Sequence, residues 1–218
     1  LDVMKSEVEQ RENAREAEGD ESVDILERLG IRAETVRDES VRSMAKEKMG
    51  GNSDRFERMF SVTNPSTEER FQEWVGAAEH PETHLLWHGS RNENWLSIMQ
   101  SGLLLRPTNA VITGKMYGYG LYFSPLCKKS MGYTSYKGSY WAGGRSDRGY
   151  MALYEVHTGK PYKDDDWRSE YSGLDYERLR SYGDYDCFWA DGGRALRNPE
   201  VVVYREEQCT IRYIIEFR

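Results

Sequence analysis

Three segments in the second half of the chain constrain the fold most strongly, because each has the residue pattern of a β-strand. They are β-branched or alternate between apolar and polar positions: residues 150–157 (YMALYEVH), 200–204 (EVVVY) and 208–217 (QCTIRYIIEF). Residues 55–63 alternate in the same way, and shorter strands are predicted at 84–87, 121–123 and 187–190. With helices predicted mainly earlier in the chain, this pattern favours an α+β domain dominated by antiparallel pairing.

Helix signals are concentrated in the first half. A short helix at 24–29 ends at Gly30, and a capping box of Thr35 and Asp38 opens a stretch that ends at Gly50. The apolar stripe of that second stretch is Val36, Val41, Met44 and Met49. Three further helical segments are predicted: one capped by Ser66 with Glu69, one capped by Asn92 with Trp95, Ile98 and Met99 buried and closed by Gly102, and a turn at 128–133.

The chain is long enough for one substantial domain with an appendage, since domains typically run to ~100–200 residues. Residues 1–21 are nearly all polar, and the first residue is Leu, so we expect a trimmed fragment that lacks its natural N-terminus and any partner domain. We therefore divide the chain into a charged, helical appendage at 1–52 and a main domain at 53–218.

Composition excludes several classes of function. A net charge of -7 argues against a surface built to follow nucleic-acid phosphates. The 3 cysteines are widely spaced and form no CxxC pair, which indicates neither a disulfide framework nor a zinc site and fits a reducing compartment. No run approaches the ~18 apolar residues of a membrane span. We expect an intracellular protein, nuclear or cytoplasmic, with a bacterial cytoplasm equally compatible.

In residues 84–90 (HLLWHGS), a histidine, a glycine and a serine lie at the end of a predicted short buried strand. Glycine at a strand end exposes its own N–H and C=O to whatever approaches, although many His-Gly pairs are ordinary turns. A long loop rich in glycine follows at 106–120, and such loops are usually functional or disordered. Tyr122 and Tyr133 can sandwich a flat ring, and Gly89 with Ser130 can bind a primary carboxamide, which together describe nicotinamide.

Plainer interpretations exist for each residue taken singly. Tyr122 and Phe123 have the composition of a strand core, Lys128 and Lys129 that of a solvated helix face, and Glu200 that of a strand-edge residue. The acidic run 164–166 is most simply a solvated turn. The functional interpretation depends on these segments occurring together with His88.

The chain resembles the catalytic domain of the poly(ADP-ribose) polymerases, the diphtheria-toxin-like ADP-ribosyltransferases. The resemblance covers residues 55–218 and is carried in the family's order by four segments: 85–105 (LLWHGSRNENWLSIMQSGLLL), 113–123 (TGKMYGYGLYF), 128–133 (KKSMGY) and 198–217 (NPEVVVYREEQCTIRYIIEF). It implies the ADP-ribosyltransferase fold and NAD as the donor substrate. It signals no metal.

The resemblance also implies roles for individual residues. The resemblance matches the family's catalytic His-Tyr-Glu triad to His88, Tyr122 and Glu200. Glu200 is chosen because it opens the late strand where the family places its glutamate. The implied NAD-binding residues are His88, Gly89, Ser90, Asn94, Tyr122, Phe123, Lys129, Ser130 and Tyr133. His88 would bond a ribose hydroxyl, Ser90 and Asn94 would lie near the adenosine ribose, and residues 106–115 would form the family's donor loop.

The implied reaction is cleavage of the nicotinamide–ribose bond and transfer of ADP-ribose to protein acceptors, including the chain itself. Glu200 permits elongation to poly(ADP-ribose). The alternatives are transfer of single units, hydrolysis of NAD as a glycohydrolase, and, in another class, a silent module that binds NAD or ADP-ribose. Nucleic acid would enter only through missing domains or through a local patch formed by Arg145, Arg148, Arg194 and Arg197.

The chain departs from the family pattern in three places. The segment before Arg55 is too short for the whole autoinhibitory helical domain of relatives that respond to DNA breaks, so the resemblance leaves DNA-dependent regulation open. Leu104 stands where some relatives place a basic residue near the adenosine, and residues 162–197 are divergent.

Overall fold

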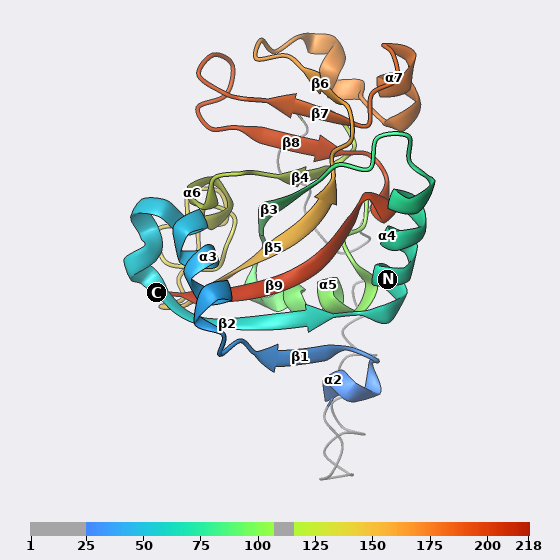
Figure 1. Cartoon of the computed structure of the whole chain (residues 1–218). Coiled ribbons are helices and arrows are strands. Elements are labelled where there is room, and N and C mark those ends of the chain that lie inside the picture. Colours follow the sequence, from blue (N-terminus) through green and yellow to red (C-terminus); the bar gives the residue numbers. More distant parts are fainter. Residues whose placement is uncertain (1–24, 107–115) are drawn as a thin grey trace, which may run out of the picture.

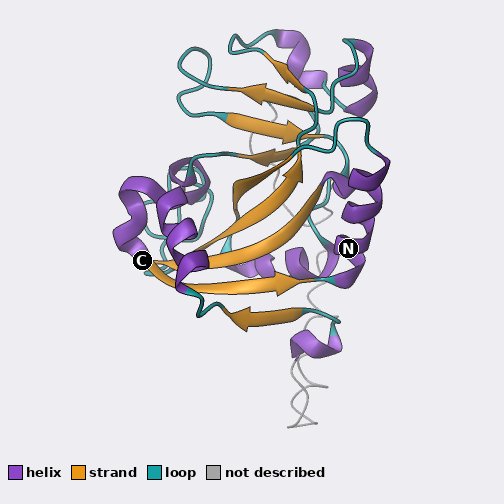
Figure 2. Cartoon of the chain, viewed as in Figure 1, coloured by secondary structure: helices purple, strands orange, loops and turns teal. Residues whose placement is uncertain are grey.

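A computed structural model describes residues 25–106 and 116–218 and shows two β-sheets surrounded by helices (Figures 1 and 2). The predicted polar tail at 1–21 and all but the first residue of the predicted donor loop at 106–115 lie outside the described residues. The mixture of helices and mainly antiparallel strands confirms the predicted α+β class.

The larger sheet has five strands in the order β1-β2-β9-β5-β3, all antiparallel to their neighbours. Their bounds are β1 Arg32–Thr35, β2 Phe56–Thr63, β3 Thr83–Gly89, β5 Gly149–His157 and β9 Cys209–Phe217. The last two are the alternating segments that the sequence predicted, and they pair with each other through most of their length. Alternation sends their side chains into two separate cores, with Ala152 and Ile214 in one and Leu153 and Ile215 in the other.

The smaller sheet has four strands in the order β4-β8-β7-β6. They are β4 Leu121–Phe123, β6 Pro161–Lys163, β7 Cys187–Ala190 and β8 Glu200–Val203. Strand β6 was not predicted, and it is the one that pairs in parallel, with β7. An isolated bridge between Trp87 and Ser124 connects this sheet to the larger one beside β3 and β4.

Helices cover both faces of the larger sheet. Figure 1 shows α3 (Glu39–Met49) in front of it and α5 (Trp95–Ser101) behind it, and the two helices contribute Met49 and Trp95 to the two cores. Helix α4 (Pro65–Ala77) lies along the side, and α6 (Cys127–Met131) lies near β3. Short helices complete the set: α2 Ile25–Arg28, α7 Tyr176–Ser181 and the 3₁₀ turns η1 Gly50–Arg55, η2 Asn92–Asn94, η3 Ser169–Gly173 and η4 Glu206–Gln208.

The structure corrects three predicted helix caps. The cap of α3 is Asp38 rather than Thr35, and its carboxylate accepts hydrogen bonds from the N–H groups of Ser40 and Val41. Helix α4 is capped by Asn64 instead of Ser66, with Pro65 in the first turn, where proline loses no hydrogen bond. Asn92 opens a 3₁₀ turn, and α5 begins only at Trp95.

The segment predicted as a helical appendage packed on the main domain also contributes a strand to the larger sheet, as far as it is described. Residues 32–35 form β1, which pairs with β2 from Arg32↔Thr63 to Thr35↔Phe60. The predicted apolar stripe of α3 is confirmed, because Met49 is buried in the core and Val36, Val41 and Met44 pack against it. These contacts join residues 32–49 to the main domain.

A buried carboxylate holds the C-terminal strand in place. The side chain of Glu216 is fully buried and pairs with Arg58 of β2 and with Arg148, which precedes β5. Burial alone would raise the pKa of Glu216, but hydrogen bonds and charges from the two arginines outweigh it and lower the pKa below its ordinary value. Arg148 is therefore engaged within the domain.

The three cysteines, Cys127, Cys187 and Cys209, are buried free thiols. Among the described residues, no helix is long and apolar enough to cross a membrane.

Candidate active site

The ends of several strands converge where the two sheets meet. Trp87 of β3 bridges to Ser124 just after β4, which brings His88 and Gly89 beside Tyr122. Tyr122 pairs with Val202 of β8, two residues from Glu200. Because side chains alternate along a strand, Glu200 and Val202 point to the same face of the smaller sheet. The segments that carry His88, Tyr122 and Glu200 are thus adjacent in space.

Gly89 approaches the backbone of Ser130 too closely for any other residue. A Cβ atom on Gly89 would lie 1.9 Å from the carbonyl oxygen of Ser130. Trp87 uses its N–H and C=O to bond Ser124 rather than β5, and strand geometry turns those of Gly89 to the same side. The Gly89 backbone and the buried residue Ser130, here named the cradle, lie together and contain the types of donor and acceptor group that a carboxamide requires.

His88 is held in one tautomer. Its Nδ1 lies 3.0 Å from the carbonyl oxygen of Tyr122, which can only accept, so Nδ1 carries the proton. Burial lowers the pKa of His88, and the hydrogen bond to Tyr122 opposes that change. A neutral ring that donates through Nδ1 presents Nε2 as an acceptor, which is suited to a sugar hydroxyl.

Tyr122 is fixed by the loop that precedes its own strand. Its hydroxyl donates to the carbonyl oxygen of Gly118 at 2.7 Å and accepts from the N–H of Tyr117 at 3.1 Å. Burial raises the pKa of the Tyr122 phenol well above its usual range, and the charge of Glu200 raises it further. The ring is therefore neutral and rigid, as a stacking surface should be.

Tyr133 lies after α6 and shares the electrostatic field of Glu200. Burial raises the pKa of Tyr133 to about 12, with the Glu200 carboxylate as the second cause. The indole of Trp141 stacks on Tyr133 with an interplanar angle of 15° and 6.1 Å between centroids. The backbone N–H of Trp141 also donates to the carbonyl oxygen of Gly132, which anchors this exposed turn next to Tyr133.

Glu200 and Lys129 form an ion pair with little access to water. Lys129 Nζ lies 2.7 Å from Glu200 Oε1, and the two side chains are 12% and 9% exposed. Burial raises the pKa of Glu200, whereas the charge and the hydrogen bond of Lys129 lower it. The lysine thus stabilises an ionised carboxylate at a site where little water is present to solvate it.

The remaining predicted NAD-binding residues fall into two groups. Ser90 and Asn94 lie together, because the Asn94 amide donates to the Ser90 hydroxyl at 3.0 Å. Phe123 does not join Tyr122: alternation along β4 sends its ring into the core behind His88, where it is 2% exposed. We therefore assign Phe123 a packing role against the His88 imidazole.

Sequence reasoning missed two aromatic residues near this region. Trp141 stands in an irregular loop with no periodic pattern, so nothing in the sequence linked it to Tyr133. Tyr117 is fully buried, receives the hydrogen bond of Tyr204 on its carbonyl oxygen and orients Tyr122 through its N–H. The glycine-rich composition around it drew attention to the loop but not to this role.

The acidic run 164–166 cross-links loops and is not merely a solvated turn. Asp164 bonds Tyr171 and Arg168, the Asp165 carboxylate accepts from the N–H of Asp191, and Asp166 pairs with Arg194. With Arg194 paired here and Arg148 paired to Glu216, two of the four arginines proposed for a basic patch are already engaged.

Comparisons with known proteins agree on one family. The family model described as "Poly(ADP-ribose) polymerase catalytic domain" matches residues 34–177. The "Putative poly [ADP-ribose] polymerase-like 100L" of Invertebrate iridescent virus 6 is 34% identical over 161 residues, which are 72% of this chain and 83% of the relative.

Longer relatives match over a shorter segment. "Poly [ADP-ribose] polymerase 2-A" of Oryza sativa subsp. japonica is 36% identical over 103 residues, and "Poly [ADP-ribose] polymerase 2" of Homo sapiens is 35% identical over 102 residues. Each match covers 47% of this chain, but only 14% of the rice protein and 16% of the human one.

Proposed function

This chain belongs to the poly(ADP-ribose) polymerase catalytic domain family and is an ADP-ribosyltransferase, and from that premise we propose how its described residues carry out the reaction. NAD is the donor, Glu200 is the central catalytic group, and the acceptors are proteins, including the chain itself. The observation that carries this proposal is the buried Glu200–Lys129 pair beside Tyr122 and Tyr133. We further propose that the transferase unit begins at β1, because β1 belongs to the same sheet as the site-bearing β3.

Binding fixes the nicotinamide end of NAD. Tyr122 and Tyr133 supply aromatic faces for its ring, a contact that contributes roughly 0.5–1.5 kcal/mol beyond area burial. The cradle of Gly89 and Ser130 holds the carboxamide through the Gly89 backbone and the Ser130 hydroxyl. His88 accepts a ribose hydroxyl on Nε2, while Ser90 and Asn94 lie toward the adenosine ribose.

Glu200 stabilises the charge that develops when the nicotinamide–ribose bond breaks. Its carboxylate accepts a hydrogen bond from the 2'-hydroxyl of the nicotinamide ribose and increases electron density near the oxocarbenium carbon. The bond's electron pair leaves with nicotinamide, which departs as a neutral molecule. The acceptor's nucleophilic oxygen then bonds to the sugar carbon, and its proton leaves with base assistance from Glu200.

Product analysis with labelled NAD tests the proposed function. We expect nicotinamide release together with a ladder or smear of labelled protein, because a carboxylate that can activate a 2'-hydroxyl permits chain growth. A single labelled band would mean that the enzyme transfers single ADP-ribose units and does not build polymer. Free ADP-ribose without labelled protein would mean that the enzyme hydrolyses NAD. If no nicotinamide were released, the chain would be a binding module and not an enzyme.

The pH dependence of transfer tests the role of Lys129. Replacing Lys129 with Met removes the positive charge that lowers the pKa of Glu200, so the pKa of this buried carboxyl rises. Activity that needs the ionised carboxylate is lost as pH falls through that pKa, and the acid limb of the kcat/KM profile therefore moves to higher pH. Lys128→Met is the matched control, because Lys128 is an exposed neighbour. If the two variants had the same pH profile of kcat/KM, Lys129 would have no role in keeping Glu200 ionised.

A further inference from the structure

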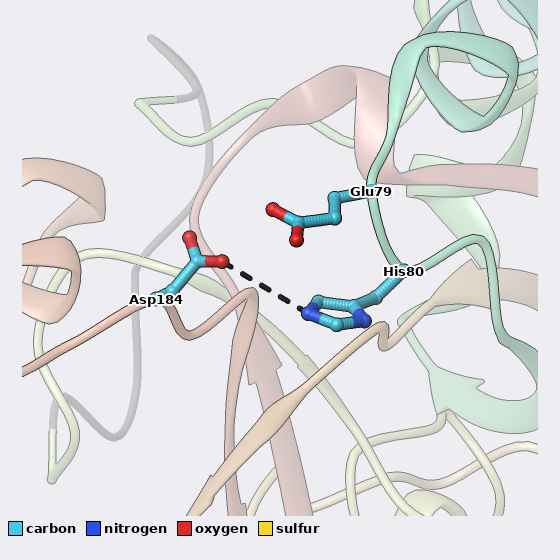
Figure 3. A group of neighbouring side chains, drawn as sticks. All are labelled: Glu79, His80 and Asp184. Carbon is cyan, nitrogen blue, oxygen red and sulfur yellow. Dashed lines mark ion pairs between the residues drawn. The ribbon is translucent and has the colours of Figure 1, made fainter.

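A second cluster of ligand-bearing side chains lies at the other end of β3 from Gly89. Glu79 and His80 belong to the segment between α4 and β3, and Asp184 to the segment between α7 and β7. Each offers one ligand atom, and these atoms all lie within 4.8 Å of one another. Figure 3 shows the Glu79 and Asp184 carboxylates and the His80 imidazole facing a common space.

Neighbouring side chains hold the Asp184 carboxylate and the backbone of His80. Arg180 pairs with Oδ1 of Asp184, which leaves Oδ2 at 3.9 Å from His80 Nε2. Trp74 donates to Nδ1 of His157, so His157 Nε2 carries a proton and donates it to the backbone carbonyl of His80 at 2.6 Å. Metal-binding side chains are typically held by outer contacts of the kind that Arg180 makes with Asp184, which fix their direction before the ion arrives.

The local charge and space suit a small cation. A cavity of about 280 Å³ is lined by residues that include Glu79, Asp184, Asp186, His80 and Arg180. Three carboxylates here face one guanidinium, so the wall carries an excess of negative charge near neutral pH. Ion pairing between His80 and Asp184 explains one contact of the cluster, but it does not explain why the Glu79 carboxylate joins them.

We propose that Glu79, His80 and Asp184 form a binding site for a zinc ion, with the fourth position open to the cavity. One imidazole nitrogen and two carboxylate oxygens are ligands that zinc accepts in tetrahedral geometry, whereas Mg²⁺ and Ca²⁺ prefer oxygen ligands alone. The ion would connect the segment that leads into the larger sheet with the segment that leads into the smaller one. This site is separate from the nicotinamide region and does not depend on the proposed function.

Zinc titration of the whole chain tests the site. Equilibrium dialysis should give one saturable zinc per chain, and Tm should rise by about 5–10 °C at a zinc concentration a hundredfold above Kd. His80→Ala and Asp184→Asn should each weaken zinc binding by more than about tenfold and abolish the rise in Tm. Magnesium at the same concentrations should produce no comparable rise.

Control variants separate this site from other zinc-binding positions. Glu82→Gln changes an exposed acid three positions from Glu79, and its zinc affinity should equal that of the unmodified chain, whereas Glu79→Gln should weaken binding. Circular dichroism establishes that each variant folds before titration. The proposal is overturned if zinc does not saturate at one ion per chain, or if His80→Ala and Asp184→Asn bind it as tightly as the Glu82 control.

Discussion

Replacing Glu200 with Gln is expected to lower nicotinamide release and ADP-ribose transfer by about 10² to 10³ in kcat, and to lower Tm because the buried Lys129 loses its charged partner. The amide keeps the shape of the side chain but removes the charge that opposes the developing oxocarbenium ion. The loss should appear mainly in kcat, because the contacts that we propose between nicotinamide and Tyr122, Tyr133 and Gly89 remain. Initial rates with labelled NAD, measured beside a thermal melt of each protein, give both quantities.

Glu207→Gln is the matched control for this experiment. Glu207 lies in η4, immediately after the strand that Glu200 opens, and carries the same charge. Its loss should leave transfer near the level of the unmodified chain. A Glu200 variant that retains its rate, or a Glu207 variant that loses as much, would assign the catalytic carboxylate to another residue. A variant that still releases nicotinamide but makes shorter products would place Glu200 in elongation alone.

Replacing Gly89 with Ala is the second change with a large expected effect. The new methyl carbon would meet the Ser130 carbonyl oxygen at 1.9 Å, and both groups belong to backbone that cannot simply rotate away. Either β3 or α6 must shift, which costs about 1–3 kcal/mol of stability. A displacement on the order of 1 Å at a reacting group lowers rates by about 10². We therefore expect a loss of that size in kcat/KM.

Gly76→Ala provides the comparison. A Cβ atom at Gly76, in α4, meets nothing within 4 Å, and alanine is the better helix former. Its Tm should rise slightly while kcat/KM stays the same. Calorimetry and NAD kinetics on the two variants together separate the steric effect at Gly89 from a general response to alanine. Normal kinetics for Gly89→Ala would show that the close contact between Gly89 and Ser130 is not needed for activity.

Much of the fold was predictable because burial imposes a pattern on sequence. Strands β5, β8 and β9 are long or rich in β-branched residues, and each was predicted within a residue or two of its bounds. Strand β1 was missed because all its residues are exposed, so no alternation marks it. The cap of α4 was misplaced because Asn64 and Ser66 are both good capping residues, and only the backbone distinguishes them.

Part of the candidate site was predicted from chemistry that few other residues could supply. Gly89 and Ser130 were paired from the carboxamide they would hold, and the structure places their backbones in contact. The Lys129–Glu200 ion pair was beyond reach, since it joins residues far apart in the chain whose separation only the folded sheet sets. Phe123 follows Tyr122 directly in the sequence, but strand alternation turns its ring into the core beside His88.

The single bridge between Trp87 and Ser124 has a consequence for how substitutions should be read in this protein. His88 belongs to one sheet, whereas Tyr122 and Glu200 belong to the other. Each sheet has its own hydrogen-bonded ladder, but a single core that contains Leu86, Leu121 and Val201 packs the two sheets together. A substitution in that shared core is therefore expected to lower the melting temperature and to displace His88 relative to Glu200, although it touches neither residue.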